Sequence, residues 1–237
     1  MKIICSICAR GGSEGLKNKN IKPMNGKPLI VWSIEQALRS KYIDKVIIST
    51  DSKDIADIAI KAGADVPELR PKKLSGNNVE KFLVMKYIFD LACKFYNKQF
   101  EYLIDLDCTN PLRDTSDIDS MIEFFTVNKK KGDMILTTAE ARKNPFFNLL
   151  IKNTNGHLDI CLKDKKNVIR RQDAPSVLEH VASIYIMKNE YLKKSNSLFE
   201  GKVLGYDIGQ EKSFDVDNEF DWEIISYLMR KKNVYKK

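Results

Sequence analysis

Apolar runs of strand length alternate with amphipathic segments of helix length through the first 138 residues. Strand-like runs lie at 3–8, 46–50, 66–69, 102–107 and 134–138, and helix-like segments at 28–38, 54–62, 79–96 and 114–128. Strands and helices in this order form a mostly parallel sheet with helices on both faces. The pattern therefore predicts an α/β fold whose active site lies beyond the carboxyl ends of the strands. That edge would carry Arg10, Thr50-Asp51, Arg70 and Asp107.

The longest predicted helix, over 79–96, carries an apolar stripe that we expect to face the core. Its members are Phe82, Leu83, Tyr87, Leu91 and Phe95.

The pattern changes after residue 144. Short strands or loops at 144–148, 157–162 and 168–171 follow one another without helices, then strands return at 182–187 and 202–206 before a helix over 218–229. We expect one domain, 1–237, in which residues 144–190 form a β-rich or dimer-forming insertion.

Composition excludes several classes of protein. Hydrophobic residues make up 43% of the chain, which is ample for a core. No apolar segment approaches the roughly 20 residues that span a membrane, and no signal-peptide pattern is present, so we expect a cytoplasmic protein. The net charge is +8, but the lysines are scattered and no nucleic-acid-binding motif accompanies them. A solvated surface is favoured over a nucleic-acid site, and an anionic small substrate would suit the charge.

A glycine-rich loop follows the first predicted strand. It begins Ala9-Arg10-Gly11-Gly12-Ser13 and continues through Lys19 to Asn20. Glycines let backbone amides approach an anion, and nearby arginine and lysine supply charge for phosphate. The loop matches neither a Walker A motif nor a dinucleotide fingerprint. It predicts a nucleotide-using enzyme, although such a turn can also be purely structural.

Two carboxylates near the other end form a second candidate group. Asp215 and Asp217 are two apart, so in an extended segment they share a face at a spacing of roughly 7 Å and could approach one Mg²⁺. Capping of the following helix is an equally good reading of either residue. Asp107, at the end of a predicted strand, is a third candidate or a turn residue bonded to local backbone.

Basic residues later in the chain suggest an anion site. Arg170-Arg171-Gln172 offers a bidentate fork for a carboxylate or phosphate, with a solvated basic turn as the alternative. Arg70, fixed ahead of Pro71, has the same two readings. His180 is more simply satisfied by local contacts.

Together these segments resemble the acylneuraminate cytidylyltransferases, the CMP-sialic acid and CMP-legionaminic acid synthetases. The resemblance runs along nearly the whole chain as blocks in the family's order. The matching blocks are 9–13, 19–23, 26–30, 48–51, 69–71, 110–113, 171–172 and 214–217.

The resemblance implies a Rossmann-like nucleotidyltransferase fold of the glycosyltransferase-A type, with 144–190 as a sugar-binding or dimerisation insertion in a homodimer. It implies transfer of CMP from CTP to a nonulosonic acid, with Mg²⁺ (or Mn²⁺) on Asp215 and Asp217. Arg10, Lys19, Arg171 and Asp217 would be catalytic. The nucleotide would contact Ala9, Arg10, Gly11, Gly12, Ser13, Lys19, Asn20 and Arg70, and the sugar Asp107, Arg170, Arg171 and Gln172.

Three departures from the family pattern stand out. Glu14 replaces a common lysine, Asp107 replaces a glutamine, and Glu179-His180 stands in the usual R-x-N-G segment. The last two fall in the part that resembles the sugar pocket, which favours a modified, legionaminic-type acid over sialic acid. Other readings are a different sugar nucleotidyltransferase, a nucleic-acid-binding protein, or a non-catalytic nucleotide-binding subunit.

Overall fold

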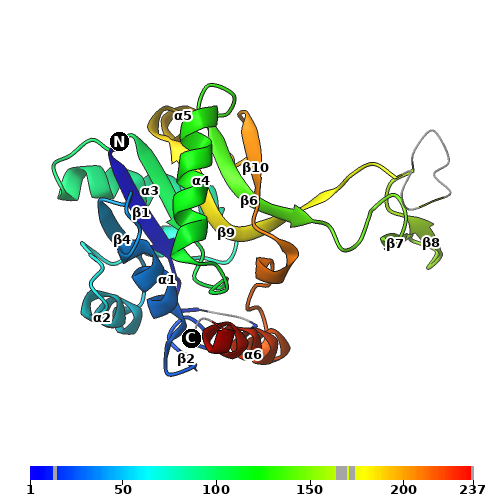
Figure 1. Ribbon diagram of the computed structural model, residues 1–237, viewed down its shortest axis with the longest axis horizontal. Helices are drawn as coiled ribbons and strands as arrows, with labels where there is room; N and C mark the ends of the chain where they lie inside the picture. Colours follow the sequence, from blue (N-terminus) through cyan, green and yellow to red (C-terminus); the bar gives the residue numbers. More distant parts are fainter. Residues whose placement is uncertain (13–14, 164–169, 171–173, 236–237) are drawn as a thin grey trace.

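The protein is built on a six-stranded, mostly parallel sheet (Figure 1). The structure is a computed structural model, and it describes residues 1–12, 15–163, 170 and 174–235, without the side chains beyond 231. The strand order is β10-β6-β9-β5-β1-β4, and only β9 runs antiparallel to its two neighbours. The predicted α/β fold is confirmed. The strands are β1 Ile3–Cys8, β4 Lys45–Ser49, β5 Tyr102–Leu106, β6 Met134–Glu140, β9 Leu178–Lys188 and β10 Val203–Asp207.

Helices cover both faces of the sheet, which is why its strands are apolar on both sides. On β1, Ile3, Cys5 and Ile7 face one core while Ile4 faces the other. The first core is completed by α1 Leu29–Leu38, α2 Lys53–Lys61 and α4 Thr115–Asn128. The second is completed by α3 Lys81–Phe95 and α5 Asn189–Lys194.

Two sequence expectations in this region are wrong. Residues 66–69 form no strand, and only an isolated bridge joins neighbouring Asp65 to Ile47. Pro67 lies within that run and lacks the amide that a ladder requires. A 3₁₀ turn, η1 (Lys72–Leu74), follows.

The predicted stripe on α3 is also misplaced. Leu83 and Phe95 are 44% and 50% exposed, whereas Met85, Ile88 and Phe89 are buried. Most members of the predicted stripe were four residues apart, a spacing that drifts around a helix of 3.6 residues per turn. Of the five, only Phe82 is fully buried.

The last helix, α6 (Glu219–Tyr235), packs against the N-terminal part of the chain (Figure 1). A small hairpin, β2 (Pro23–Met24) and β3 (Lys27–Pro28), turns at Asn25 and Gly26, both with positive φ. A third core joins these elements through Met24, Leu29, Leu112, Val216, Trp222, Ile225 and Met229. The hairpin of β2 and β3 and the last helix thus meet below the carboxyl edge of the sheet (Figure 1).

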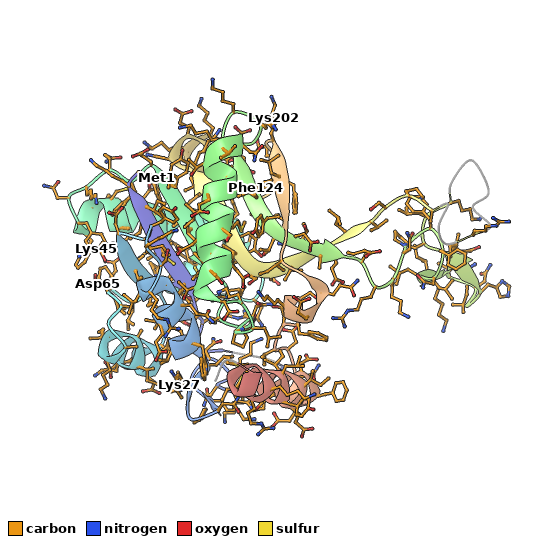
Figure 2. All side chains as sticks on the ribbon, in the orientation of Figure 1. Met1, Lys27, Lys45, Asp65, Phe124 and Lys202 are labelled. Atoms are coloured by element: carbon orange, nitrogen blue, oxygen red, sulfur yellow. The ribbon has the colours of Figure 1, made fainter. Side chains whose placement is uncertain are left out.

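A second hairpin lies away from the sheet, between β6 and β9. Its strands are β7 (Leu150–Lys152) and β8 (Leu158–Ile160), and Figure 2 shows them and their side chains standing clear of the other elements. Exposed apolar side chains gather on it: Phe147, Leu149, Leu150, Ile151, Leu158 and Leu162.

No helix within the described ranges is long and apolar enough to cross a membrane.

Candidate active site

A cavity of about 520 Å³ lies beyond the carboxyl ends of β1 and β5. Residues 74–79, between η1 and α3, form one wall, and the loop after β1 contributes another. The cavity brings together six residues singled out from the sequence: Arg10, Lys19, Asn20, Arg70, Asp107 and Asp217.

Other candidates lie elsewhere. Ala9 is buried in the core, and the Gly11 amide donates to Asp51 Oδ1 at 2.9 Å. Gly12 is exposed within the loop, and Arg170 is exposed between β8 and β9. Ser13, Arg171 and Gln172 lie outside the described residues, as does Glu14, so their roles stay predictions.

The loop after β1 is joined directly to the segment before α6. Lys19 Nζ donates to the Val216 carbonyl at 2.7 Å and lies 3.3 Å from Asp217 Oδ1. Gly15 faces the Asp217 carbonyl so closely that an added Cβ would lie 2.2 Å from that oxygen. Only glycine allows this approach without a shift of the backbone.

Asn20 and Arg10 hold the loop in shape. Asn20 is buried, donates to the Arg10 carbonyl at 3.0 Å and accepts from the Cys108 thiol at 3.2 Å. Arg10 donates to Asn77 Oδ1, which ties the mouth of the loop to the wall over 74–79.

Of the two readings of Arg70, the solvated basic turn is wrong, because the residue is only 7% exposed, and anion binding stays a prediction. Arg70 lines the cavity, yet its guanidinium is largely buried and donates to the carbonyls of Ser49 at 2.6 Å and Leu74 at 3.5 Å. The side chain therefore fixes the wall of the cavity to the end of β4.

The carboxylates of Asp215 and Asp217 differ in their surroundings. Asp217 is 77% exposed and lies beside Lys19. Asp215 Oδ1 is buried, and no described residue donates a hydrogen bond to it. Burial and then the charge of Asp107 raise the pKa of Asp215 to about 7, although the neighbouring Asn110 amide opposes the rise. A buried carboxylate oxygen without a partner is suited to a bound cation.

Helix capping is performed by other residues. Asn218 Oδ1 accepts from the Asp221 amide at 3.0 Å, and Asp221 Oδ2 accepts from the Asn218 amide at 3.2 Å. This is the reciprocal arrangement of a capping box. The side chains of Asp215 and Asp217 are thus not needed to begin α6.

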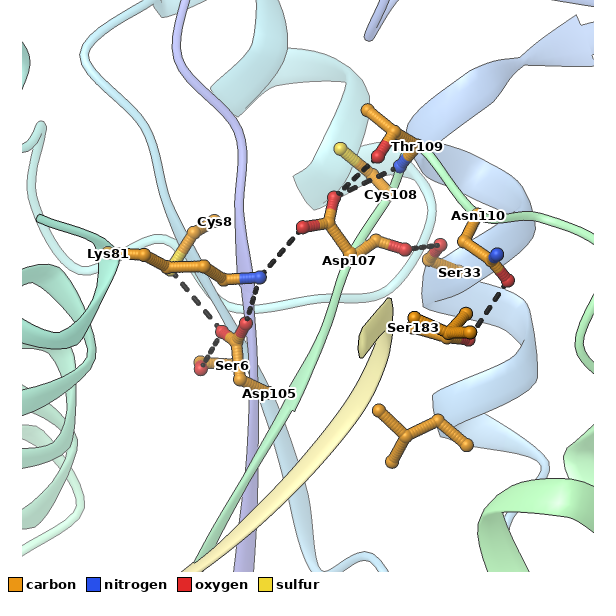
Figure 3. Close-up of polar contacts among 12 residues, drawn as sticks. Ser6, Cys8, Ser33, Lys81, Asp105, Asp107, Cys108, Thr109, Asn110 and Ser183 are labelled. Carbon is orange, nitrogen blue, oxygen red and sulfur yellow. Dashed lines mark hydrogen bonds and ion pairs between the residues drawn. The ribbon is translucent and has the colours of Figure 1, made fainter. Parts of the chain in front are cut away.

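Lys81, which the sequence did not single out, lines the cavity, and Figure 3 shows its amino group pointing toward Asp105 and Asp107. Its Nζ is 3.0 Å from Asp105 Oδ2 and 2.7 Å from Asp107 Oδ2, and it lies 4.4 Å from the centre of the Tyr185 ring. Burial would lower the pKa of Lys81, but the two carboxylates outweigh it and hold that pKa well above its usual value. The sequence feature that could have indicated this cluster is Asp105, a charged residue in the middle of an apolar strand.

Asp107 is held as an ionised acceptor. Its Oδ1 accepts from the Thr109 amide at 3.2 Å and the Thr109 hydroxyl at 2.9 Å, and its Oδ2 accepts from Lys81. Burial would raise its pKa, but Lys81 and the hydrogen bonds lower it. Asp107 therefore bonds to the local backbone of the turn, as the sequence suggested, and also lines the cavity.

Two buried side chains after Asp107 shape this edge of the site; both lie in the 110–113 block that resembles the family, but the pattern predicted no role for either. Arg113 is 1% exposed and donates to the carbonyls of Asp107 and Asn110, both at 2.7 Å. Asn110 donates to the carbonyls of Lys212 at 2.8 Å and Phe214 at 3.1 Å. The segment before Asp215 is thereby tied to the end of β5.

Comparison with known proteins identifies the family. A family profile described as cytidylyltransferase matches residues 4–235. The chain belongs to the cytidylyltransferase family. The resemblance seen in the sequence is thus confirmed, and the protein is a nucleotidyltransferase.

Individual relatives cover nearly the whole chain. It is 41% identical to the post-translational flagellin modification protein B of Campylobacter coli over 100% of this chain and 98% of that one. It is 39% identical to the CMP-N,N'-diacetyllegionaminic acid synthase of Campylobacter jejuni, over 98% and 97%. A solved CMP:2-keto-3-deoxy-manno-octonic acid synthetase complexed with CTP shares the fold, with a TM-score of 0.71 at 17% identity over 98% and 100% of the chains.

Proposed function

We propose that this cytidylyltransferase transfers CMP from CTP to the anomeric hydroxyl of a nonulosonic acid of the legionaminic type. The anomeric oxygen forms a bond to the α-phosphorus, the bond from that phosphorus to the bridging oxygen breaks, and pyrophosphate leaves. The hydroxyl proton is lost in the same reaction. The observation that carries the proposal is the meeting of the N-terminal loop, Lys19 and Asp217 at one cavity.

The cations at the cavity suit a triphosphate. Lys19 and Arg10 lie on the same loop and can bind phosphate oxygens, the first as a compact charge and the second as a planar fork. Asn20 and Arg70 would form the nucleotide side, mainly by holding the walls against which the nucleotide lies.

Asp215 and Asp217 would hold one Mg²⁺ or Mn²⁺. The unpartnered, buried Asp215 Oδ1 fits such an ion. No cluster of three or more metal-ligating side chains is present among the residues that the structure describes. Mg²⁺ commonly binds one or two carboxylates and completes its shell with phosphate oxygens and water, so a pair is sufficient. When bound, the ion would offset negative charge on the phosphates.

The legionaminic type of sugar is supported by two kinds of evidence. The relative from Campylobacter jejuni carries that activity in its name. In addition, Asp107 is a cavity residue in this chain, and it departs from the glutamine of many sialic acid enzymes.

We also propose that the chain forms a homodimer through residues 144–190. The hairpin of β7 and β8 carries apolar side chains that nothing in the described chain covers: Leu150, Ile151 and Leu158 are all more than half exposed. Exposed apolar patches of this kind mark interaction surfaces. We also propose that residues 144–190 contribute to sugar binding.

The function can be tested with a panel of nucleotides and sugars. Purified protein is incubated with Mg²⁺, each of CTP, UTP, ATP and GTP, and each of N,N'-diacetyllegionaminic acid, sialic acid and pseudaminic acid, and pyrophosphate is measured. We expect release only with CTP and fastest with the legionaminic acid. Release without a preference for CTP would point to a different nucleotidyltransferase, and CTP binding without release to a non-catalytic subunit.

A further inference from the structure

Lys81, Asp105 and Asp107 form a charged cluster of which the proposed function uses Asp107 alone, on the sugar side. Asp105 is 0% exposed; its Oδ1 accepts from the Ser6 hydroxyl at 2.6 Å and the Cys8 thiol at 3.4 Å, and its Oδ2 lies 3.0 Å from Lys81 Nζ (Figure 3). Lys81 is one-third exposed and Asp107 is 19% exposed, and both line the cavity. The cluster therefore runs from the core of the sheet to the surface on which a substrate would lie.

The existing hydrogen bonds of Asp107 leave it able to accept one more hydrogen bond, from a ligand. An ionised carboxylate only accepts hydrogen bonds and has about four acceptor positions. Thr109 occupies two of them and Lys81 one, which leaves one position on a carboxylate that faces the cavity. A group that donates, such as a hydroxyl or amide N–H, fits this position.

A carboxylate of the ligand does not suit the position next to Asp107. Lys81 interacts with Asp105 and Asp107, and both carboxylates are also near the buried Arg113, so the positive charge at Asp107 is already supplied by the protein. A substrate carboxylate placed here would be repelled. The sugar acid must then present a donor group to Asp107 and direct its own carboxylate elsewhere.

We propose that Lys81, anchored by Asp105, is a positioning residue that fixes Asp107 as an acceptor for a hydroxyl or amide N–H of the sugar, and so determines which sugar acids are accepted. This inference rests on the proposed function. Without the lysine, the Asp107 carboxylate can rotate away from the cavity, because only the bonds from Thr109 would remain on one of its oxygens. The low pKa of Asp107 agrees with an ionised acceptor at neutral pH.

A purely structural role would have a different signature. Lys81 is the first residue of α3 and directly follows the wall over 74–79. If it only anchored the helix, its loss would displace this wall, which includes Asn77, the partner of Arg10. CTP binding would then weaken as much as sugar binding.

The test is a double-mutant cycle on the full-length protein. Lys81→Met, Asp107→Asn and the double variant are compared with wild type for the KM of N,N'-diacetyllegionaminic acid at saturating CTP, kcat, and the Kd of CTP measured without sugar. Lys94→Met, an exposed lysine on the same helix, is the control.

We expect Lys81→Met and Asp107→Asn each to raise the KM for the sugar about 10- to 100-fold while the Kd of CTP changes less than about twofold, as for the loss of a charge-assisted hydrogen bond. The double variant should be no worse than Asp107→Asn, because Lys81 acts through Asp107. Lys81→Arg, which keeps the charge, should recover part of the loss. If Lys81→Met does not fold, the cycle is run with Lys81→Arg.

Losses that multiply in the double variant, an unchanged KM, or a Kd of CTP that rises with the KM would each overturn the inference. These outcomes require an active wild type. A wild type that makes no product with any sugar of the panel would instead reject the proposed function.

Discussion

Lys19 Nζ lies 2.7 Å from the carbonyl oxygen of Val216, a residue 197 positions later in the chain. This bond joins the glycine-rich loop to the segment that carries the two candidate metal ligands. The close approach of Gly15 to the Asp217 carbonyl reinforces the same junction. The nucleotide side and the metal side of the site are therefore built as one unit, although they come from opposite ends of the sequence.

Replacing Lys19 by glutamine should lower kcat/KM for CTP by about 10- to 100-fold. The substitution removes a charge from the cavity and weakens the bond to Val216, and bonds to charged groups contribute about 1.5–3 kcal/mol each. Steady-state pyrophosphate release at varied CTP measures the effect. Lys17→Gln, an exposed neighbour on the same loop, is the control and should retain wild-type kinetics. Equal losses in both variants would show that general charge, rather than the position of Lys19, matters.

Asp215 should make the metal-free protein less stable as the pH rises. The pKa of a free aspartate is about 3.9, and that of Asp215 in the folded protein is about 7. Between these values the folded state binds more protons than the unfolded state, so the free energy of unfolding falls as pH increases. Thermal unfolding in EDTA should give a higher Tm at pH 5.5 than at pH 8. The part of this difference that belongs to Asp215 is found by comparison with variants of single acidic residues.

The matched variants for this prediction are Asp215→Asn and Asp57→Asn. Asp215→Asn should raise the Tm at pH 8 and weaken the pH dependence, whereas Asp57→Asn, on the exposed side of α2, should follow wild type. Mg²⁺ added at pH 8 should stabilise the wild type more than Asp215→Asn. A Tm at pH 8 that falls in Asp215→Asn would contradict the account of this carboxylate.

Replacing Arg113 by methionine should destabilise the fold by about 3 kcal/mol or more. The buried guanidinium satisfies the carbonyls of Asp107 and Asn110, and carbonyls left buried without donors are costly. Urea unfolding measures the loss, with Arg39→Met, at the exposed position that follows α1, as the control. A change below about 1 kcal/mol would mean that water or other donors replace the guanidinium.

The apolar hairpin should govern self-association. Ile151→Asp with Leu158→Asp should convert a dimer to a monomer, because each places a charge on an apolar surface that a second copy would cover. Light scattering after size exclusion gives the mass. Val127→Asp, at an 84% exposed position on α4, is the control and should leave the mass unchanged. A wild-type monomer at micromolar concentration would reject the proposed dimer.

The sequence predicted those parts of the site that follow from strand ends. The loop after β1 and Asp107 after β5 could be placed on one edge because parallel strands present their carboxyl ends together. Asp217 was recognised from its spacing with Asp215 and from the family resemblance. These predictions depend on the order of strands and on the spacing of nearby residues, both of which can be read from one sequence.

Lys81, Asn110 and Arg113 could not be recognised in the same way. At the start of an amphipathic helix, a lysine is normally a surface residue, and its role depends on two carboxylates from a strand that lies more than 20 residues later. Asn110 and Arg113 meet partners that are distant in the chain: Asn110 bonds to Ser183 of β9 and to Phe214 before α6, and Arg113 bonds to Ser33 of α1. The 110–113 block resembled the family but predicted no role for Asn110 or Arg113, whereas Asp105 carried a physical signal, since a charged residue within an apolar strand requires a buried partner.

The most direct test of the central claim is identification of the product formed from CTP and N,N'-diacetyllegionaminic acid. Phosphorus NMR of the reaction with Mg²⁺ should show a new CMP-sugar phosphodiester and pyrophosphate in equal amounts, and Arg10→Ala should reduce both together. Pyrophosphate with free CMP and no phosphodiester, or no reaction with any nonulosonic acid, would contradict the assignment of this cavity to cytidylyl transfer.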